Sequence, residues 1–190
     1  MTESLQPIVL VGGASRRFGR DKLLEPHKGS MGGEFLVDQP VLALRAVFGP
    51  IVWLVGDCSS AVARRGDQHA PDGYPGVGPL GGILTGLERL AADILVLPGD
   101  APAITSSDVR ALSDHARRMP EADAVLARTT DLEPCIAVYR QTAVPAMRAA
   151  IGAGRFAVRA ALDQMLVSTL ALSADAARNV NRPEDLRDHA

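Results

Sequence analysis

Cysteine and long hydrophobic runs are scarce in this sequence, and positive charge is not in excess. Its only cysteines, Cys58 and Cys135, lie in or beside apolar segments, which favours two buried, reduced thiols over a disulfide or a zinc site. No stretch approaches the roughly 18 consecutive apolar residues that span a bilayer. The opening residues MTESLQP lack the basic and apolar regions of a signal peptide. We therefore expect a cytoplasmic protein that does not enter a membrane.

The balance of charges excludes further classes of protein. Basic residues number 20 and acidic residues 22, so the formal net charge of -2 does not suggest a nucleic-acid-binding protein. Apolar residues make up 47% of the chain and charged residues 22%, which is typical of a globular rather than a disordered protein. The four histidines show no metal-ligand spacing. A length of 190 residues suits one domain over residues 1–190.

Short apolar segments alternate with helix-like windows along most of the chain. We predict strands at 7–11, 51–55, 94–98, 124–127, 135–139 and 166–172. Most of these segments are apolar without alternation, as in strands that are covered on both faces. We predict helices at 39–47, 79–91, 106–118, 141–151, 156–165 and 183–188. This order predicts a three-layer α/β fold with a mainly parallel sheet.

Local signals mark the starts of two of these helices and one loop. Thr105 with Asp108, and Asn181 with Glu184, have the spacing of capping pairs at helix N-termini. Three glycines within residues 27–33 predict a mobile surface loop.

The segment VGGASRRFGRDK, residues 11–22, follows the first predicted strand and predicts a phosphate-binding loop. Its glycines, at 12, 13 and 19, allow backbone amides to approach an oxyanion closely. Its cations suit phosphate oxygens through charge-assisted hydrogen bonds, and they are Arg16, Arg17, Arg20 and Lys22. In open α/β folds, ligands bind at the carboxyl ends of strands, where this loop begins. A solvated basic turn is the alternative interpretation.

Two common phosphate-binding motifs do not fit the sequence. A P-loop needs four residues between its glycines and then Lys-Ser/Thr, whereas five residues separate Gly13 from Gly19. The segment GVGPLG, residues 76–81, matches the dinucleotide pattern Gly-x-Gly-x-x-Gly. That motif requires a strand before its first glycine, and the preceding residues HAPDGYP do not suit a central strand.

Two aspartates are candidate ligand contacts. Asp100 follows the apolar segment ILVLPG, where a single carboxylate can hold Mg²⁺ together with substrate phosphates, or can cap the next turn. Asp72, in DGYPGVGP, can accept hydrogen bonds from guanine N1 and N2 or from a ribose. An aspartate before glycine is equally a turn residue.

Five segments in this order resemble the molybdenum cofactor guanylyltransferase family of the nucleotidyltransferase superfamily. They are VGGASRRFGRDK, DGYPGVGPLGGILTGL, LVLPGDAP, EPCIAVY and NVNRPEDL, and they span nearly the whole chain. The resemblance implies a Rossmann-like, nucleotide-diphospho-sugar-transferase-like domain. It also implies transfer of GMP from GTP to the phosphate of molybdenum-bearing molybdopterin, with release of pyrophosphate. Implied partners are those two substrates, with transient contacts to proteins that deliver the cofactor or accept the product.

The resemblance also implies roles for individual residues. It makes Arg16, Lys22 and Asp100 the catalytic residues, with Asp100 as the ligand of Mg²⁺. It assigns Asn179 and Asn181 to the pterin substrate, although Asn181 can instead be only a helix cap. The implied nucleotide contacts are Val11, Gly12, Gly13, Arg16, Arg17, Gly19, Lys22, Asp72 and Asp100.

Two departures from the family pattern leave undecided which acceptor substrate and which nucleotide base the protein uses. The glycine-rich stretch makes equivalences over residues 26–60 unsafe, and Glu133 stands where a neutral or basic residue is more usual. One alternative is a nucleotidyltransferase that transfers CMP to the same pterin, or that uses another phosphorylated acceptor. A second alternative is a nucleotide-binding regulator without catalysis, against which the presence of both Lys22 and Asp100 argues.

Overall fold

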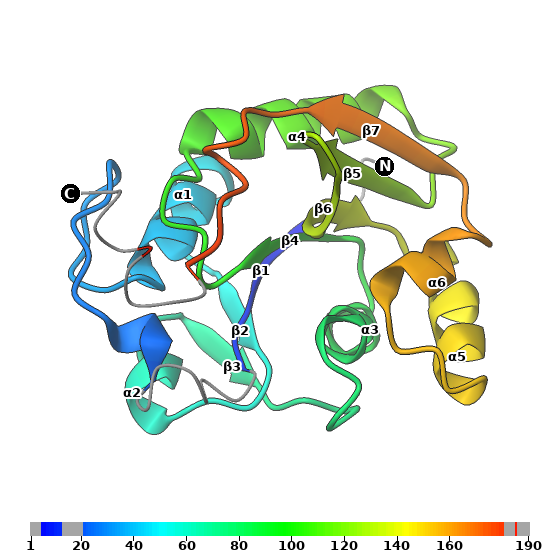
Figure 1. Ribbon diagram of the computed structural model, residues 1–190, viewed down its shortest axis with the longest axis horizontal. Coiled ribbons are helices and arrows are strands. Elements are labelled where there is room, and N and C mark those ends of the chain that lie inside the picture. The colour runs from blue at the N-terminus through cyan, green and yellow to red at the C-terminus, as the bar shows by residue number, and fades with distance from the viewer. Residues whose placement is uncertain (1–4, 13–20, 181–184, 186–190) are drawn as a thin grey trace.

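The computed structural model describes residues 5–12, 21–180 and 185, and its centre is a seven-stranded sheet (Figure 1). The strand order is β3-β2-β1-β4-β6-β5-β7. β6 is antiparallel to its neighbours β4 and β5, and the other pairs are parallel. The predicted α/β fold with a mainly parallel sheet is therefore confirmed. The strands are β1 (Gln6–Leu10), β2 (Trp53–Val55), β3 (Gln68–Ala70), β4 (Ile94–Pro98), β5 (Ala124–Arg128), β6 (Leu132–Tyr139) and β7 (Val167–Ala171).

Helices cover both faces of the sheet and make the fold three layers deep (Figure 1). One face packs against α1 (Asp38–Phe48) and α4 (Ser106–Arg118), with α2 (Ser60–Ala63) at its margin. The other face packs against α3 (Pro79–Leu90), α5 (Val144–Gly152) and α6 (Val158–Leu162). Two short 3₁₀ helices, η1 (Lys22–Leu24) and η2 (Gln141–Ala143), complete the described helices.

The central strand β4 shows why most predicted strands are apolar throughout and do not alternate between apolar and polar residues. Leu95 and Leu97 belong to the core on the α1 and α4 side, whereas Ile94 and Val96 belong to the core on the α3 side. All four side chains have no exposed surface. Because both faces are covered, every position of such a strand favours an apolar residue.

The structure differs from the predicted elements mainly in short segments. The predicted strand 51–55 loses its first two positions, and Ile51 is 57% exposed. The predicted helix 141–151 is present as η2 followed by α5, and the predicted helix 156–165 shortens to α6. The sequence analysis missed η1, α2 and the edge strand β3. β3 consists of Gln-His-Ala with two exposed positions, so it has no apolar pattern to detect.

The capping pair of α4 is confirmed in both directions. The amide of Asp108 donates to Thr105 Oγ1 over 3.3 Å, and the amide of Thr105 donates to Asp108 Oδ2 over 2.9 Å. This is the reciprocal capping box that the spacing predicts. The predicted pair Asn181 and Glu184, and the predicted helix 183–188, lie outside the described residues apart from residue 185.

Buried polar side chains anchor the glycine-rich surface loop that precedes α1. Gln39, 1% exposed, accepts from the Met31 amide over 3.2 Å and donates to the Ile104 carbonyl over 2.9 Å. Asp38 accepts from the Phe35 amide over 3.0 Å and pairs with the guanidinium of Arg65. Burial raises the pKa of Asp38, but the hydrogen bonds from Arg65 and the loop amides outweigh burial and keep that pKa below its usual value. The loop therefore has fixed attachments that its glycines alone do not indicate.

None of the described helices is long and apolar enough to cross a membrane.

Candidate functional site

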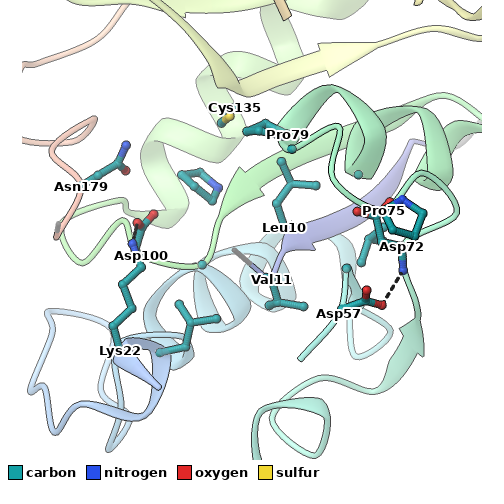
Figure 2. A pocket seen from close by; sticks show the side chains of 18 of the residues that line it. Leu10, Val11, Lys22, Asp57, Asp72, Pro75, Pro79, Asp100, Cys135 and Asn179 are labelled. Carbon is teal, nitrogen blue, oxygen red and sulfur yellow. Dashed lines mark hydrogen bonds and ion pairs between the residues drawn. The ribbon is translucent and has the colours of Figure 1, made fainter. Parts of the chain in front are cut away.

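A cavity of about 520 Å³ lies at the carboxyl ends of β1, β2 and β4 (Figure 2). Its walls also include the first turn of α3, two residues of η1, and single residues from β6 and the segment after β7. The chain leaves β1 through α1 on one face, and it returns to β4 through α3 on the other face. This reversal makes the crevice beside β1 the position where open α/β sheets bind ligands. The volume lies in the range of small-molecule sites.

The floor of the cavity is formed by two strand ends whose backbones approach closely. The Val11 amide donates to the Val55 carbonyl over 2.9 Å. A side chain at Gly56, where φ is +127°, would place its Cβ 1.6 Å from the Val11 carbonyl oxygen. Gly12 has φ +125° and faces the backbone of Asp57. Only glycines allow this approach, which leaves peptide groups rather than bulky side chains facing a ligand.

At one end of the cavity, Lys22 and Asp100 form an ion pair (Figure 2). Their side chains are only 19% and 15% exposed. Asp21 accepts from the Leu23 amide over 3.2 Å and so caps η1, the short helix that presents Lys22. Asp100 follows the Pro98-Gly99 end of β4, and the Gly99 amide donates to the Leu10 carbonyl over 3.0 Å. The predicted phosphate contact Lys22 and the predicted metal ligand Asp100 therefore contact each other directly.

The segment after β7 joins the same end of the cavity. The Val180 amide donates to the Asp100 carbonyl over 2.9 Å, and the Val180 carbonyl accepts from Lys22 Nζ over 3.2 Å. Asn179 lines the cavity, and its Oδ1 is buried without a hydrogen-bond partner among the described residues. A buried amide oxygen without a partner costs free energy, which a bound ligand can recover.

The opposite end of the cavity carries two more carboxylates, Asp57 and Asp72 (Figure 2). Asp57 Oδ1 accepts from the Asp72 amide over 3.1 Å. The sequence analysis predicted Asp72 but missed Asp57. Asp57 follows β2 as Asp100 follows β4, so its position after a predicted buried strand was an available signal.

The wall between these ends is the first turn of α3. Gly78 caps this helix, and Gly78, Pro79 and Gly82 line the cavity. A Cβ at Gly82 would lie 2.9 Å from Leu10 Cδ2, and one at Gly86 would lie 2.7 Å from Ile8 Cδ1. The helix therefore lies close against β1 because its contact face lacks side chains. Its positive dipole end, with no acidic residue in the first turn, faces the cavity and favours a bound anion.

Cys135 lines the cavity from β6 beside Asp100. Burial raises the pKa of this thiol to about 12, with contributions from the charges of Asp100 and Glu133, so it stays protonated at neutral pH. Cys135 and Cys58 are free thiols, as predicted, but each is only partly buried. Glu133, the unusual residue of the fourth segment, accepts from Thr129 Oγ1 over 2.9 Å and does not line the cavity.

The structure brings all six of the described candidate residues into one cavity. Those residues are Val11, Gly12, Lys22, Asp72, Asp100 and Asn179. The other candidates lie outside the described residues, and they are Gly13, Arg16, Arg17, Gly19 and Asn181. Within residues 5–12, 21–180 and 185, no group of three or more His, Cys, Asp or Glu side chains is arranged to hold a metal ion.

Comparison with curated proteins reveals relatives over nearly the full chain. A protein of Methanothermobacter thermautotrophicus named probable molybdenum cofactor guanylyltransferase is 30% identical over 205 residues, which cover 98% of this chain and 100% of the relative. A protein of the same name from Deinococcus radiodurans is 31% identical and covers 97% of this chain and 93% of the relative.

Solved structures share the fold at lower sequence identity. Molybdopterin-guanine dinucleotide biosynthesis protein A from Archaeoglobus fulgidus aligns with a TM-score of 0.76 and 21% identity, covering 97% of this chain and 96% of that chain. CMP:2-keto-3-deoxy-manno-octonic acid synthetase in complex with CTP aligns with a TM-score of 0.71 and 15% identity, covering 97% and 96%. The family model described as the MobA-like NTP transferase domain matches residues 7–169. The chain therefore belongs to the MobA-like NTP transferase family, as the order of its five sequence segments predicts.

Proposed function

We propose that this protein transfers GMP from GTP to the terminal phosphate of molybdenum-bearing molybdopterin and releases pyrophosphate. The observation that carries the proposal is the meeting of Lys22, Asp100 and Asn179 at one end of a glycine-floored cavity. The relatives named molybdenum cofactor guanylyltransferase, which match nearly the full chain, support the choice of substrates.

The two ends of the cavity suit the two parts of a nucleotide. The triphosphate fits the end with Lys22, which supplies a positive charge, and the dipole of α3, whose first turn lies between the two ends, adds to the attraction for an anion. The nucleoside fits the opposite end, where the carboxylate of Asp72 can accept hydrogen bonds from base or ribose donors. Roles of Gly13, Arg16, Arg17 and Gly19 at the phosphates stay predictions, because these residues lie outside the described part of the chain.

The donor atoms beside the triphosphate end fit a divalent cation such as Mg²⁺. Asp100 offers an anionic oxygen, and Asn179 offers a buried amide oxygen with no described partner. Hard oxygen ligands are those that Mg²⁺ prefers, and it usually takes one or two carboxylates together with substrate phosphates and waters. When bound, such an ion would neutralise negative charge on the transferring phosphate.

The pterin contacts of Asn179 and Asn181, and the cytoplasmic location, stay predictions.

The proposed reaction needs no nucleophilic side chain. An oxygen of the acceptor phosphate attacks the α-phosphorus of GTP, a new P–O bond forms, and the bond to the bridging oxygen breaks so that pyrophosphate leaves. The barrier comes from repulsion between anions and from misalignment, so the protein acts by holding both substrates and balancing charge. Lys22 supplies a positive charge once it exchanges Asp100 for phosphate oxygens. The protonated Cys135 adds no negative charge to that space.

Direct measurement of dinucleotide formation tests the proposed function. Purified protein is incubated with molybdenum-loaded molybdopterin, a magnesium salt and one of GTP, CTP or ATP, and the products are separated and identified. We expect a guanine dinucleotide and pyrophosphate from GTP. A product from CTP alone would support the cytidylyltransferase alternative. Tight nucleotide binding without any product would support the regulator instead.

Replacing Lys22 by methionine is expected to weaken GTP binding by about 10-fold to 100-fold, the cost of one lost charge-assisted contact. Methionine keeps a linear apolar side chain and removes only the charge. Titration calorimetry with GTP and magnesium measures the dissociation constant. The matched control is Lys28→Met, since Lys28 is exposed and outside the cavity. An unchanged dissociation constant for Lys22→Met would contradict the phosphate role.

A further inference from the structure

We infer that Asp57 and Thr85 are positioning residues that hold Asp72 against the nucleoside of the bound nucleotide. The inference rests on the proposed function and concerns the end of the cavity opposite Lys22. It assigns Asp57 and Thr85 no direct contact with the substrate. Their proposed action is to fix where the Asp72 carboxylate lies, and so to set how well the nucleotide binds.

The link between Asp57 and Asp72 joins two segments that are distant in sequence. Asp57 follows β2, whereas Asp72 begins the loop that runs from β3 to α3. The Asp72 amide donates to Asp57 Oδ1 over 3.1 Å (Figure 2). Gly56, directly before Asp57, is locked against Val11 because no larger residue fits there. Asp57 therefore extends from a rigid part of the floor and restrains the Asp72 backbone.

A second restraint comes from α3. Thr85 is 7% exposed, and its hydroxyl donates to the Gly81 carbonyl over 2.8 Å within the helix. The same oxygen accepts from the Gly73 amide over 3.0 Å. A buried hydroxyl on a helix thus fixes the residue that follows Asp72. Asp57 therefore holds the amide of Asp72, and Thr85 of α3 holds the next amide along the same loop.

These restraints leave part of the Asp72 carboxylate available to a ligand. Asp72 Oδ1 accepts from the Tyr74 amide over 2.9 Å and lies 3.4 Å from Thr85 Oγ1. The described hydrogen bonds of the Asp72 side chain all involve this one oxygen, and Asp72 lines the cavity, so we assign the contact with a ligand to Oδ2. A carboxylate oxygen held in place loses less freedom on binding, so its hydrogen bonds to a nucleoside are stronger overall. Guanine N1 and N2, or the ribose hydroxyls, are donors of the required kind.

Substitutions at Asp57 separate a positioning role from a direct one. Asp57→Ala removes the acceptor for the Asp72 amide and is expected to raise the KM for GTP about tenfold, with kcat within about threefold of the parent. Asp57→Asn retains an amide oxygen that can accept the same bond, so its KM should stay within about twofold. Thr85→Val should resemble Asp57→Ala, and Thr85→Ser should resemble the parent. Asp163→Ala, at an exposed position after α6, serves as the control.

A double-mutant cycle makes the decisive measurement. If Asp57 acts through Asp72, then Asp57→Ala changes GTP affinity in the parent but not in a chain that already carries Asp72→Ala. Equal losses in both backgrounds, or a failure of Asp57→Asn to restore affinity, would overturn the positioning role. Binding of ITP and 2′-deoxy-GTP to the parent and to Asp72→Ala shows whether the base or the ribose supplies the donors.

Calorimetric GTP binding keeps this test independent of turnover. A parent protein that binds GTP without forming dinucleotide would refute the proposed transfer and leave the inference on Asp72 testable. A parent that forms dinucleotide while Asp57→Ala binds GTP unchanged would refute only the inference. Circular dichroism melting of each variant checks that a weaker affinity does not come from an unfolded chain.

Discussion

Replacing Asp100 by asparagine is expected to lower kcat by about 100-fold or more, the scale observed when one preorganised electrostatic group is lost. Asparagine has nearly the same shape but no charge, so the fold stays intact while a cation loses its anionic ligand. The change also frees Lys22 from its ion pair. Affinity for GTP in the absence of metal should therefore not fall, because the lysine no longer has to leave a carboxylate before it contacts phosphate.

Turnover of the Asp100→Asn protein is measured by pyrophosphate release at magnesium concentrations from micromolar to millimolar. We expect a lower kcat at saturating metal and a higher metal concentration for half-maximal rate. Asp163→Asn is the matched control, since Asp163 is exposed and does not line the cavity. Parental turnover of Asp100→Asn at low magnesium would contradict the assignment of this carboxylate to the metal.

Replacing Gly56 by alanine is expected to cost about 3 kcal/mol or more of unfolding free energy, or to prevent folding. Its Cβ would lie 1.6 Å from the Val11 carbonyl oxygen, which is backbone and cannot rotate away. The positive φ of +127° adds strain for any residue with a side chain. Relief requires β1 and β2 to separate at their ends, which would also open the floor of the cavity.

Substitutions at two other glycines distinguish the effect of the steric clash from the effect of the positive φ. Gly154 has φ +69° with open space around it, so Gly154→Ala should cost only about 1 kcal/mol. Gly152, at the end of α5, has neither a positive φ nor a neighbour within 4 Å, so Gly152→Ala should be neutral or slightly stabilising. Urea unfolding of the three variants measures the differences in their free energy of unfolding. A Gly56→Ala protein as stable as Gly154→Ala would show that the two strand ends are not locked together.

The sequence predicted those elements that are long or fully apolar. β4 and α4 were placed correctly because β4 is covered on both faces and α4 begins with a reciprocal capping box. β3 and α2 were missed because three or four residues with mixed polarity leave no periodic signal. β6 is antiparallel to β4, a direction that an isolated apolar segment cannot indicate.

The site was predicted where residues stand beside a recognisable strand or glycine motif. Lys22 and Asp100 are 78 positions apart, and it is the fold that places them in contact. Asp57 follows a predicted strand as Asp100 does, but its hydrogen bond with a backbone amide of a distant loop is recorded by no residue pattern. The contact between Val180 and Asp100 was likewise beyond prediction, since it joins an irregular segment to a strand end through peptide groups.

The hydrogen bond between Val180 and Asp100 ties a segment that is synthesised late to a strand end that is synthesised much earlier. All seven strands lie before residue 172, so a nascent chain can complete its sheet before Asn179 and Val180 have emerged. The cavity is complete only when this later segment contacts Asp100, because Asn179 is part of its wall.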